Sequence, residues 1–182
     1  METPDEELVI QVQKGESSLF NTLVERYQRR IYGVVLGMVH HREEALDLAQ
    51  EVFLKAYKSL PQFKGHSRFY TWLYRIAVNT VIDFRRKSKG MQTFSIDDES
   101  IKEIPGNTAS PDRQAINQEL KGELHAALDS LPEDQRAIII LRELEELSYQ
   151  EIADTFECSI GTVMSRLHYA RKRLRERLKS YL

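Results

Sequence analysis

The sequence of 182 residues has a single cysteine, Cys158, which excludes a disulfide framework and a cysteine-rich zinc site. It also has no long apolar run: the longest, residues 137–141, is far too short to cross a bilayer. The first seven residues contain four acidic side chains and no basic one, the opposite of a secretory signal peptide. We therefore expect a soluble, reduced, cytoplasmic protein that does not insert into a membrane.

Proline and glycine are also scarce, with 5 and 8 copies, and several mark breaks between segments of helical period. Apolar residues recur every three or four positions over residues 16–40, 42–60 and 67–87, whereas almost no segment alternates with period two. The period is lost over residues 88–114, which are rich in Ser, Gly, Asn and Pro, and it then resumes. The pattern predicts an all-α fold of two small helical domains, joined by an acidic flexible linker; the ranges are 1–90, 115–182 and, for the linker, 91–114.

The formal net charge is only −2, but the charges are unevenly distributed along the chain. Residues 61–90 carry seven Lys and Arg against one acidic residue, and so do residues 159–182. Between them, residues 119–158 carry eleven acidic residues against three basic ones. One basic run would fit a solvated helix face. Two separate basic helices favour two contacts with a polyanion and leave other surfaces for other partners.

The C-terminal domain contains the pattern of a helix-turn-helix. Ser148 and Glu151 fit a capping box at the start of a short helix, Cys158 and Ser159 form the turn, and Ser159 also caps the second helix. The outer face of that helix carries short polar groups and an arginine near its start and cations further along. This order suits base edges in a major groove followed by phosphates. An ordinary helical hairpin with a basic face is the alternative, and the caps, spacing and charge together favour DNA binding.

The helix predicted at residues 67–87 carries a line of polar side chains. Three cations and an amide share this line: Arg68, Arg75, Asn79 and Arg86. At about 100° per residue they stay within about 20° of one line along the helix. Cations interleaved with aromatic residues suit a single strand with unstacked bases. Trp72 lies on the apolar face and is expected in the core, whereas Phe63 and His66, in a loop with Gly65, are expected to touch a base.

The sequence carries no catalytic or metal-binding motif. Neither His-Glu-x-x-His, nor a phosphate loop, nor a nucleophile elbow occurs. The adjacent side chains of His40 and His41 would point about 100° apart on a helix, which keeps the two rings from sharing a metal. Cys158 is expected to be a packed thiol rather than a redox switch. We therefore expect no enzymatic activity, no catalytic residue, no metal and no cofactor.

Two clusters of motifs give the chain a resemblance to a known family. The N-terminal cluster is DLAQEVFLKAY at 47–57, FKG at 63–65 and FYTWLYRIAVNT at 69–80; the C-terminal cluster is LPE at 131–133, YQEIA at 149–153 and GTVMSRL at 161–167. With them, the chain resembles the extracytoplasmic-function (ECF) sigma factors of bacterial RNA polymerase, in the sigma-70 family. The resemblance covers both domains in order, the first like sigma region 2 and the second like region 4. The first cluster is the more specific, because many response regulators share the helix-turn-helix.

The resemblance implies an alternative sigma factor for transcription initiation with three contact surfaces. Core RNA polymerase would be bound by Asp47, Gln50, Glu51, Phe53, Lys55 and Tyr57. The minus-10 element, with a flipped non-template base and an opening duplex, would be bound by Phe63, Lys64, Gly65, His66, Ser67, Arg75, Asn79, Asp83, Arg85, Arg86 and Lys87. The minus-35 element would be read by Thr162, Met164, Ser165, Arg166, His168, Tyr169 and Arg171. The implied partners are core polymerase, promoter DNA and an anti-sigma protein.

A stand-alone transcription regulator is the alternative that the sequence leaves open. It would bind duplex DNA through residues 148–175 and would leave the helix at residues 45–57 without a task. It predicts no stoichiometric complex with core polymerase, whereas a sigma factor must form one.

Overall fold

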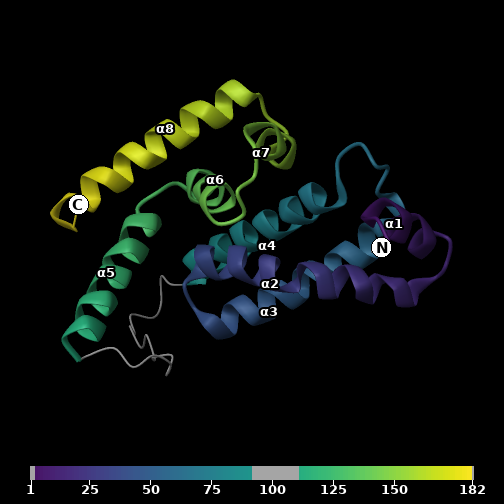
Figure 1. Cartoon of the computed structure of the whole chain (residues 1–182), viewed down its shortest axis with the longest axis horizontal. Helices are drawn as coiled ribbons and strands as arrows, with labels where there is room; N and C mark the ends of the chain where they lie inside the picture. Colours follow the sequence, from purple (N-terminus) through teal and green to yellow (C-terminus); the bar gives the residue numbers. More distant parts are fainter. Residues whose placement is uncertain (1–2, 92–110, 182) are drawn as a thin grey trace.

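The computed structural model describes residues 3–91 and 111–181, and in these ranges the regular elements are helices (Figure 1). The N-terminal body contains α1 (Asp5–Gln13), η1 (Ser17–Leu19), α2 (Phe20–Val39), α3 (Arg42–Ser59), η2 (Leu60–Gln62) and α4 (Phe69–Met91). The C-terminal body contains α5 (Pro111–Asp129), α6 (Glu133–Glu143), α7 (Tyr149–Phe156), α8 (Ile160–Arg177) and η4 (Lys179–Tyr181). The all-α prediction is confirmed. None of these helices in the described ranges is long and apolar enough to span a membrane.

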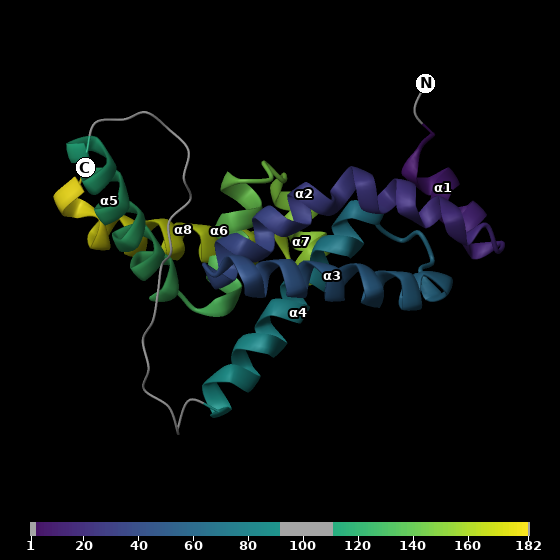
Figure 2. The ribbon, with the colours of Figure 1, turned by 90° about the horizontal axis from the view of Figure 1, so that it is seen from below.

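Helix α2 is the central helix of the N-terminal body and begins later than its apolar period suggests. The period predicts a helix over residues 16–40, but η1 occupies its first turn. Leu23, Ile31 and Val35 are fully buried on α2, which packs against α3 and α4. The helix ends at His40, whose left-handed φ of 62° reverses the chain. Helix α3 therefore lies alongside α2 (Figure 2).

Helix α1 packs on α2 and leaves little signal in the sequence. Leu8 and Val9 are buried and Val12 packs against the same core, so the apolar stripe of this nine-residue helix is short. Its start is tied to α2 by Asp5, whose carboxylate accepts hydrogen bonds from Arg26 and Tyr27. A negative group in the first turn also suits the helix dipole. Polar contacts at its start thus add to apolar packing in placing α1.

The helices flanking the predicted linker extend into it from both sides. Helix α4 continues to Met91, and α5 already begins at Pro111, where proline suits the first turn of a helix. Residues 92–110 of the predicted linker lie outside the described residues. Residues 111–114, predicted as linker, belong to α5.

The two bodies share one continuous hydrophobic core within the described residues. Helix α6 packs on α2, and α7 packs on α4. A Cβ added to Gly37 of α2 would lie 3.4 Å from the Cδ1 atom of Ile140 on α6, an ordinary van der Waals distance, so the two helices are in direct contact at this point. A domain as small as the C-terminal body has a marginal core when alone. Packing on the N-terminal body therefore supplies part of its apolar burial.

Arg136 of α6 is the largest fully buried side chain in the described ranges, with 1% of its area exposed. Its guanidinium donates to three carbonyl oxygens at the end of α5 and in the following turn, at 2.8 to 3.3 Å. It lies 3.2 Å from the carboxylate of Asp129 and 3.3 Å from that of Glu133. Arg85 of α4 pairs with the same two carboxylates at 3.0 and 3.3 Å and donates to the carbonyl of Met38 at the end of α2. Two arginines thus join four helices, α2, α4, α5 and α6, at one place.

Replacing Arg136 with alanine should strongly destabilise the chain. The change leaves buried carbonyl oxygens without a donor, and loss of one partner from a buried ion pair costs about 3–5 kcal/mol. Urea unfolding followed by circular dichroism should show a fall of about this size in the free energy of unfolding. Arg29→Ala, which removes an exposed cation of α2, is the control and should change it by less than about 0.5 kcal/mol. Equal unfolding midpoints for the two variants would contradict the role assigned to Arg136.

Candidate nucleic-acid interface

The loop between η2 and α4 combines packed and exposed side chains. Phe63 is half-buried, with its ring centroid 4.9 Å from that of Trp72. Trp72, expected in the core, packs against it but is half-buried rather than enclosed. Lys64 and His66 are exposed, and Gly65 has a φ of 71°, a conformation that glycine adopts without strain. The aromatic residues therefore support the loop while its polar side chains face outward.

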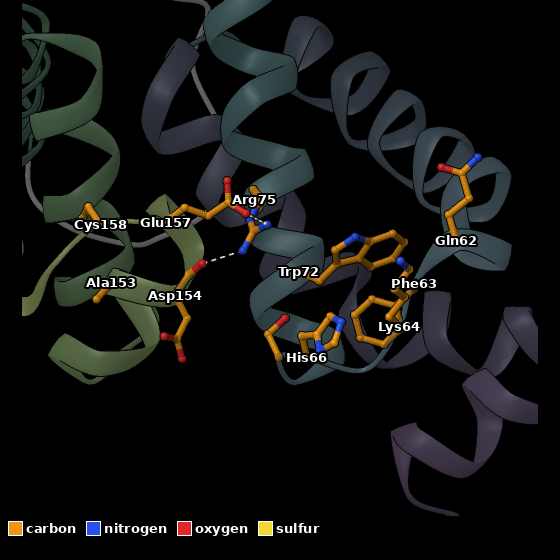
Figure 3. A pocket seen from close by; sticks show the side chains of 11 residues that line it. Gln62, Phe63, Lys64, His66, Trp72, Arg75, Ala153, Asp154, Glu157 and Cys158 are labelled. Carbon is orange, nitrogen blue, oxygen red and sulfur yellow. Dashed lines mark hydrogen bonds and ion pairs between the residues drawn. The ribbon is translucent and has the colours of Figure 1, made fainter.

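An open cavity of about 430 Å³ lies between this loop and the C-terminal body (Figure 3). The loop, with Ser67, and the first turns of α4, with Trp72 and Arg75, form one wall. Asp154 of α7 and Glu157 of the following turn form the other. The structure thus brings the predicted minus-10 loop to one surface, but it places the helix-turn-helix directly opposite.

The C-terminal half of the polar line on α4 is exposed to solvent, whereas a neighbouring arginine is occupied by contacts within the chain. Asn79, Arg86 and Lys87 are exposed, and Arg86 pairs with Asp83 at 2.8 Å. Arg85, predicted to contact DNA, is instead bonded to the carboxylates that surround the buried arginine of α6. In this arrangement Arg85 is a joint between the two bodies.

Arg75 lies in the middle of the same line, and each of its three guanidinium nitrogens donates a hydrogen bond to the C-terminal body. Its Nη2 donates to the carbonyl of Asp154 at 2.6 Å and its Nε to the carbonyl of Thr155 at 3.2 Å. Its Nη1 donates to the carboxylate of Glu157 at 2.6 Å. These acceptors belong to the C-terminal end of α7, where helix carbonyls are free to accept and attract cations. Arg75 therefore binds the helix-turn-helix body.

Two tyrosines of α4 bond to carboxylates of the C-terminal body. Tyr70 donates to Glu151, and Tyr74 donates to Glu145, which also pairs with Arg30 of α2 at 2.7 Å. Burial raises the pKa of Tyr74, and the hydrogen bond to Glu145 raises it further. Sequence reasoning missed these contacts. The excess of acidic residues between the two basic segments was the available signal, but it does not say which cations or hydroxyls they meet.

The predicted helix-turn-helix is present as α7 and α8. Ser148 and Glu151 form the capping box, with each side chain accepting from the other residue's backbone N–H. Glu157 ends α7 with a left-handed φ of 50°, at a position that glycine favours. Ser159 caps α8 by accepting from the N–H of Thr162 at 3.1 Å. The caps fix where α7 ends and α8 begins, as the sequence predicts.

The outer face of α8 presents the residues predicted to read DNA. Met164, Ser165, His168, Tyr169 and Arg171 are exposed, and Thr162 and Arg166 are half-buried. Met164 and Tyr169 expose 54% and 60% of their areas and are therefore accessible on this face. Arg166 lies 3.1 Å from Asp134, and Arg171 lies 2.8 Å from Glu143, both on α6. Two of the cations predicted to contact DNA are thus paired within the chain.

The outer face of α3 carries the residues predicted to bind polymerase. Asp47, Gln50, Glu51, Lys55 and Tyr57 are exposed, whereas Phe53 is half-buried against the core. Sequence reasoning did not single out Leu46 and Leu54, which expose 52% and 60% of their areas. With Gln50 and Tyr57, they lie within an arc of about 80° on the helix. The structure adds an apolar patch to the predicted polar residues.

A histidine pair lies away from these surfaces, where α2 meets α5. The rings of His40 and His125 stack 4.2 Å apart, and His40 Nε2 lies 3.6 Å from Asp129. Burial lowers the pKa of His125, and the neighbouring His40 lowers it further, which favours the neutral ring that stacking needs. Across the described ranges no three His, Cys, Asp or Glu side chains gather as a metal site.

Two sequence-family models match the chain in the order that the motifs suggest. Sigma-70 region 2 matches residues 23–90, and Sigma-70 region 4 matches residues 121–174. The RNA polymerase sigma-H factor of Pseudomonas aeruginosa is 41% identical over 188 residues, covering 98% of this chain and 95% of the relative. The ECF RNA polymerase sigma-E factor of Escherichia coli is 41% identical over 178 residues, covering 92% and 91%.

Two solved structures have a similar fold. The sigma factor RpoE of Bartonella quintana, in complex with the anti-sigma factor NepR, is 28% identical with a TM-score of 0.67, covering 88% of this chain and 96% of that one. CnrH, in complex with the cytosolic domain of CnrY, is 22% identical with a TM-score of 0.71, covering 97% of each chain. At that identity, CnrH supports the fold alone.

Replacing Ser159 with alanine should loosen the start of α8. The change removes the side-chain acceptor of a helix N-cap, which costs about 1 kcal/mol. Chemical denaturation should show this loss in the free energy of unfolding. Ser165→Ala, in the exposed interior of the same helix, is the matched control and should not lower it, because alanine favours helix. An unchanged stability of the Ser159 variant would mean that other contacts hold the turn.

Proposed function

The chain belongs to the sigma-70 family as an ECF sigma factor that directs RNA polymerase to promoters, and we propose that three surfaces of it perform this task. Sigma factors are not enzymes, so the chain supplies binding contacts while polymerase supplies the reaction. A stand-alone regulator, the alternative left by the sequence, does not account for a region 2 match that includes all of α3 and all but the last residue of α4.

The first proposed surface is the outer face of α3, which binds core polymerase. Its support is the exposed apolar patch of Leu46, Leu54 and Tyr57, rimmed by charged side chains that include Asp47 and Glu51. Apolar centres with polar rims are typical of protein interfaces. A helix held along its whole length against α2 and α4 presents this patch on a rigid support.

The second proposed surface binds the minus-10 element through the loop at residues 63–67 and the polar line of α4. Asn79 is exposed at the centre of that line, and an amide can bond the edge of a base that has left the stack. Capturing that base favours the melted promoter, because the contact exists in the open state and not in the duplex. Each captured base contributes about 1–3 kcal/mol of stacking, so several contacts act together.

The third proposed surface is the outer face of α8, which reads the minus-35 element in the major groove. The observation that carries the proposal most directly is the exposure of Met164, Ser165 and Tyr169 along the second helix of a capped helix-turn-helix. Polar side chains near the start of such a helix meet base edges. Arg171 and the cations beyond it are placed to meet phosphates once the pairs with α6 are exchanged for DNA.

We also propose that the chain binds an anti-sigma protein and that it acts in the cytoplasm. The similar sigma factor of Bartonella quintana was solved with its anti-sigma factor, and the shared fold supports a partner of the same class here. The chain is expected to act in the cytoplasm because directing RNA polymerase to promoters requires it to meet both polymerase and promoter DNA.

Run-off transcription with core polymerase across a promoter library tests the proposed function. With the chain present, transcripts should start at a defined set of promoters that share two spaced elements. Without the chain, core polymerase should show no such selection. Loss of selection after removal of residues 111–182 would agree with the assignment of minus-35 reading to α8. No selection by the full chain would overturn the proposal.

Asn79→Ala should slow promoter opening more than initial promoter binding. The amide contacts DNA in the melted state, so its loss should reduce the opening rate by about tenfold, within the range of one base contact. A permanganate-footprint time course measures opening, and a gel-shift assay at low temperature measures binding. Arg29→Ala, on the exposed side of α2, serves as the control. Equal losses at both steps would contradict the assignment.

Leu54→Asp should weaken binding to core polymerase by about tenfold or more, because it places a charge in an apolar patch. It should leave the free energy of unfolding within about 0.5 kcal/mol, since Leu54 is 60% exposed. Fluorescence anisotropy of the labelled chain with core polymerase measures the affinity. Ile10→Asp makes the same change at a residue of α1 that is 49% exposed and should bind normally. Similar losses in both variants would argue against a specific patch on α3.

A further inference from the structure

We propose that Gln13, the last residue of α1, is a positioning residue for the loop at residues 63–67, which it holds in place to capture a base of the melted promoter. This inference rests on the proposed function and adds a residue to it. Helix α1 precedes the region 2 match, which begins at residue 23, and sequence reasoning assigned it no role. Gln13 acts through backbone carbonyl oxygens of the chain and not by contact with DNA.

The side-chain amide of Gln13 bonds to both ends of η2. Its Nε2 donates to the carbonyl oxygen of Leu60 at 2.8 Å and to that of Phe63 at 2.9 Å. Leu60 is buried, which partly shields the first of these bonds from water. An amide nitrogen carries two hydrogens, so one side chain makes both bonds. The start of the loop is thereby joined to a residue 50 positions earlier in the chain.

Helix α1 gives this amide a fixed support. Leu8 and Val9 are buried in the core that α1 shares with α2. At the other end of α1, the carboxylate of Asp5 accepts hydrogen bonds from two side chains of α2. Through Gln13, the loop is therefore connected to the central helix of the N-terminal body.

The loop itself has little packing to hold it. Phe63 packs against Trp72 with a ring separation of 4.9 Å, but residues 64–66 are exposed. A second open cavity, of about 810 Å³, is lined by residues 63–69 and by apolar side chains of α1. The loop thus borders open space toward both α1 and α7. Its position depends on its anchored ends, and Gln13 holds the first of them.

A loop that is held in advance binds a base more tightly than a loop that must be ordered during capture, because the ordering cost is subtracted from the binding free energy. If loss of both bonds leaves about one chain in ten with the loop in its binding conformation, base capture weakens about tenfold. The base is available in the open state and not in the duplex. Promoter opening should therefore suffer, whereas initial promoter binding should not.

The first experiment replaces Gln13 with methionine, which keeps the unbranched side chain, removes both donors and adds no charge. Gln11→Met is the matched control, because the Gln11 amide donates to Glu7 within α1 itself. With core polymerase and a promoter selected in the run-off library, permanganate footprinting should show opening about tenfold slower for Gln13→Met than for Gln11→Met. Polymerase affinity and initial promoter binding should be the same in both. Equal opening rates would overturn the inference.

The second experiment separates positioning of the loop from a general weakening of the chain. Single abasic sites are placed in turn along the non-template strand of the minus-10 element, and the site that slows wild-type opening most marks the captured base. At that site Gln13→Met should slow opening by no more than about twofold, because no base remains to be captured, whereas at neighbouring sites it should keep its effect of about tenfold.

The abasic series also distinguishes failure of this inference from failure of the proposed function. A full loss in the Gln13 variant at every abasic site would mean that the residue does not act through base capture, which overturns its positioning role alone. If no abasic site slows opening by the wild-type chain, the proposed capture of a base by the loop is itself wrong, and the inference falls with it.

Amide hydrogen exchange tests the same contact in the free chain. Exchange in a peptide covering residues 60–67 should be severalfold faster in Gln13→Met than in Gln11→Met, because the start of the loop has lost its support. Peptides from α2 should exchange alike in the two variants. Unchanged exchange in the loop would show that other contacts hold it, and faster exchange throughout the chain would show a global loss of stability. Either result would overturn a local role for Gln13.

Discussion

Pairing between guanidinium and carboxylate groups holds the two helical bodies of this chain together. The sequence places its acidic excess between two basic segments, and the fold brings the acidic segment against both. Arg85 and Arg136 meet Asp129 and Glu133 at one end of the contact, and Arg75 meets Glu157 at the other. Cations that the sequence predicts to contact DNA thus meet carboxylates of the same chain where the two bodies pack together.

The pairs differ in strength because they differ in exposure. Arg136 is buried and satisfies several backbone carbonyls, so breaking its contacts would leave polar groups without partners or water. The pair of Arg75 with Glu157 is open to solvent on one side, where water and salt replace it at little cost. Burial therefore makes the contacts of Arg136 stronger than the solvent-exposed contact at the end of α7.

This difference links the fold to the task of a sigma factor. Two bodies that must reach separate promoter elements need rigid helices within each body and an adjustable relation between the bodies. Caps and apolar stripes make the helices of each body rigid; Ser148, for example, caps the start of α7 and Ser159 caps the start of α8. Solvent-exposed ion pairs between the bodies, such as that of Arg75 with Glu157, allow the relation between the bodies to be adjusted. The apolar side chains of Leu46, Leu54 and Tyr57 on α3 are exposed in this arrangement, as the proposed polymerase contact requires.

The sequence by itself determined the all-α class, the capped helix-turn-helix, the polar line on α4 and the family, because caps and helical period depend on residues close together in the chain. It could not reveal α1, whose position depends on Asp5 meeting Arg26 and Tyr27, or the buried state of Arg136. Tertiary structure alone decided that Arg85 joins the bodies and that Arg75 faces α7. The reason is physical: an arginine looks the same in a sequence whether its partner is a phosphate or a carboxylate, and packing brings the carboxylate of Glu157 to Arg75 from 82 residues away.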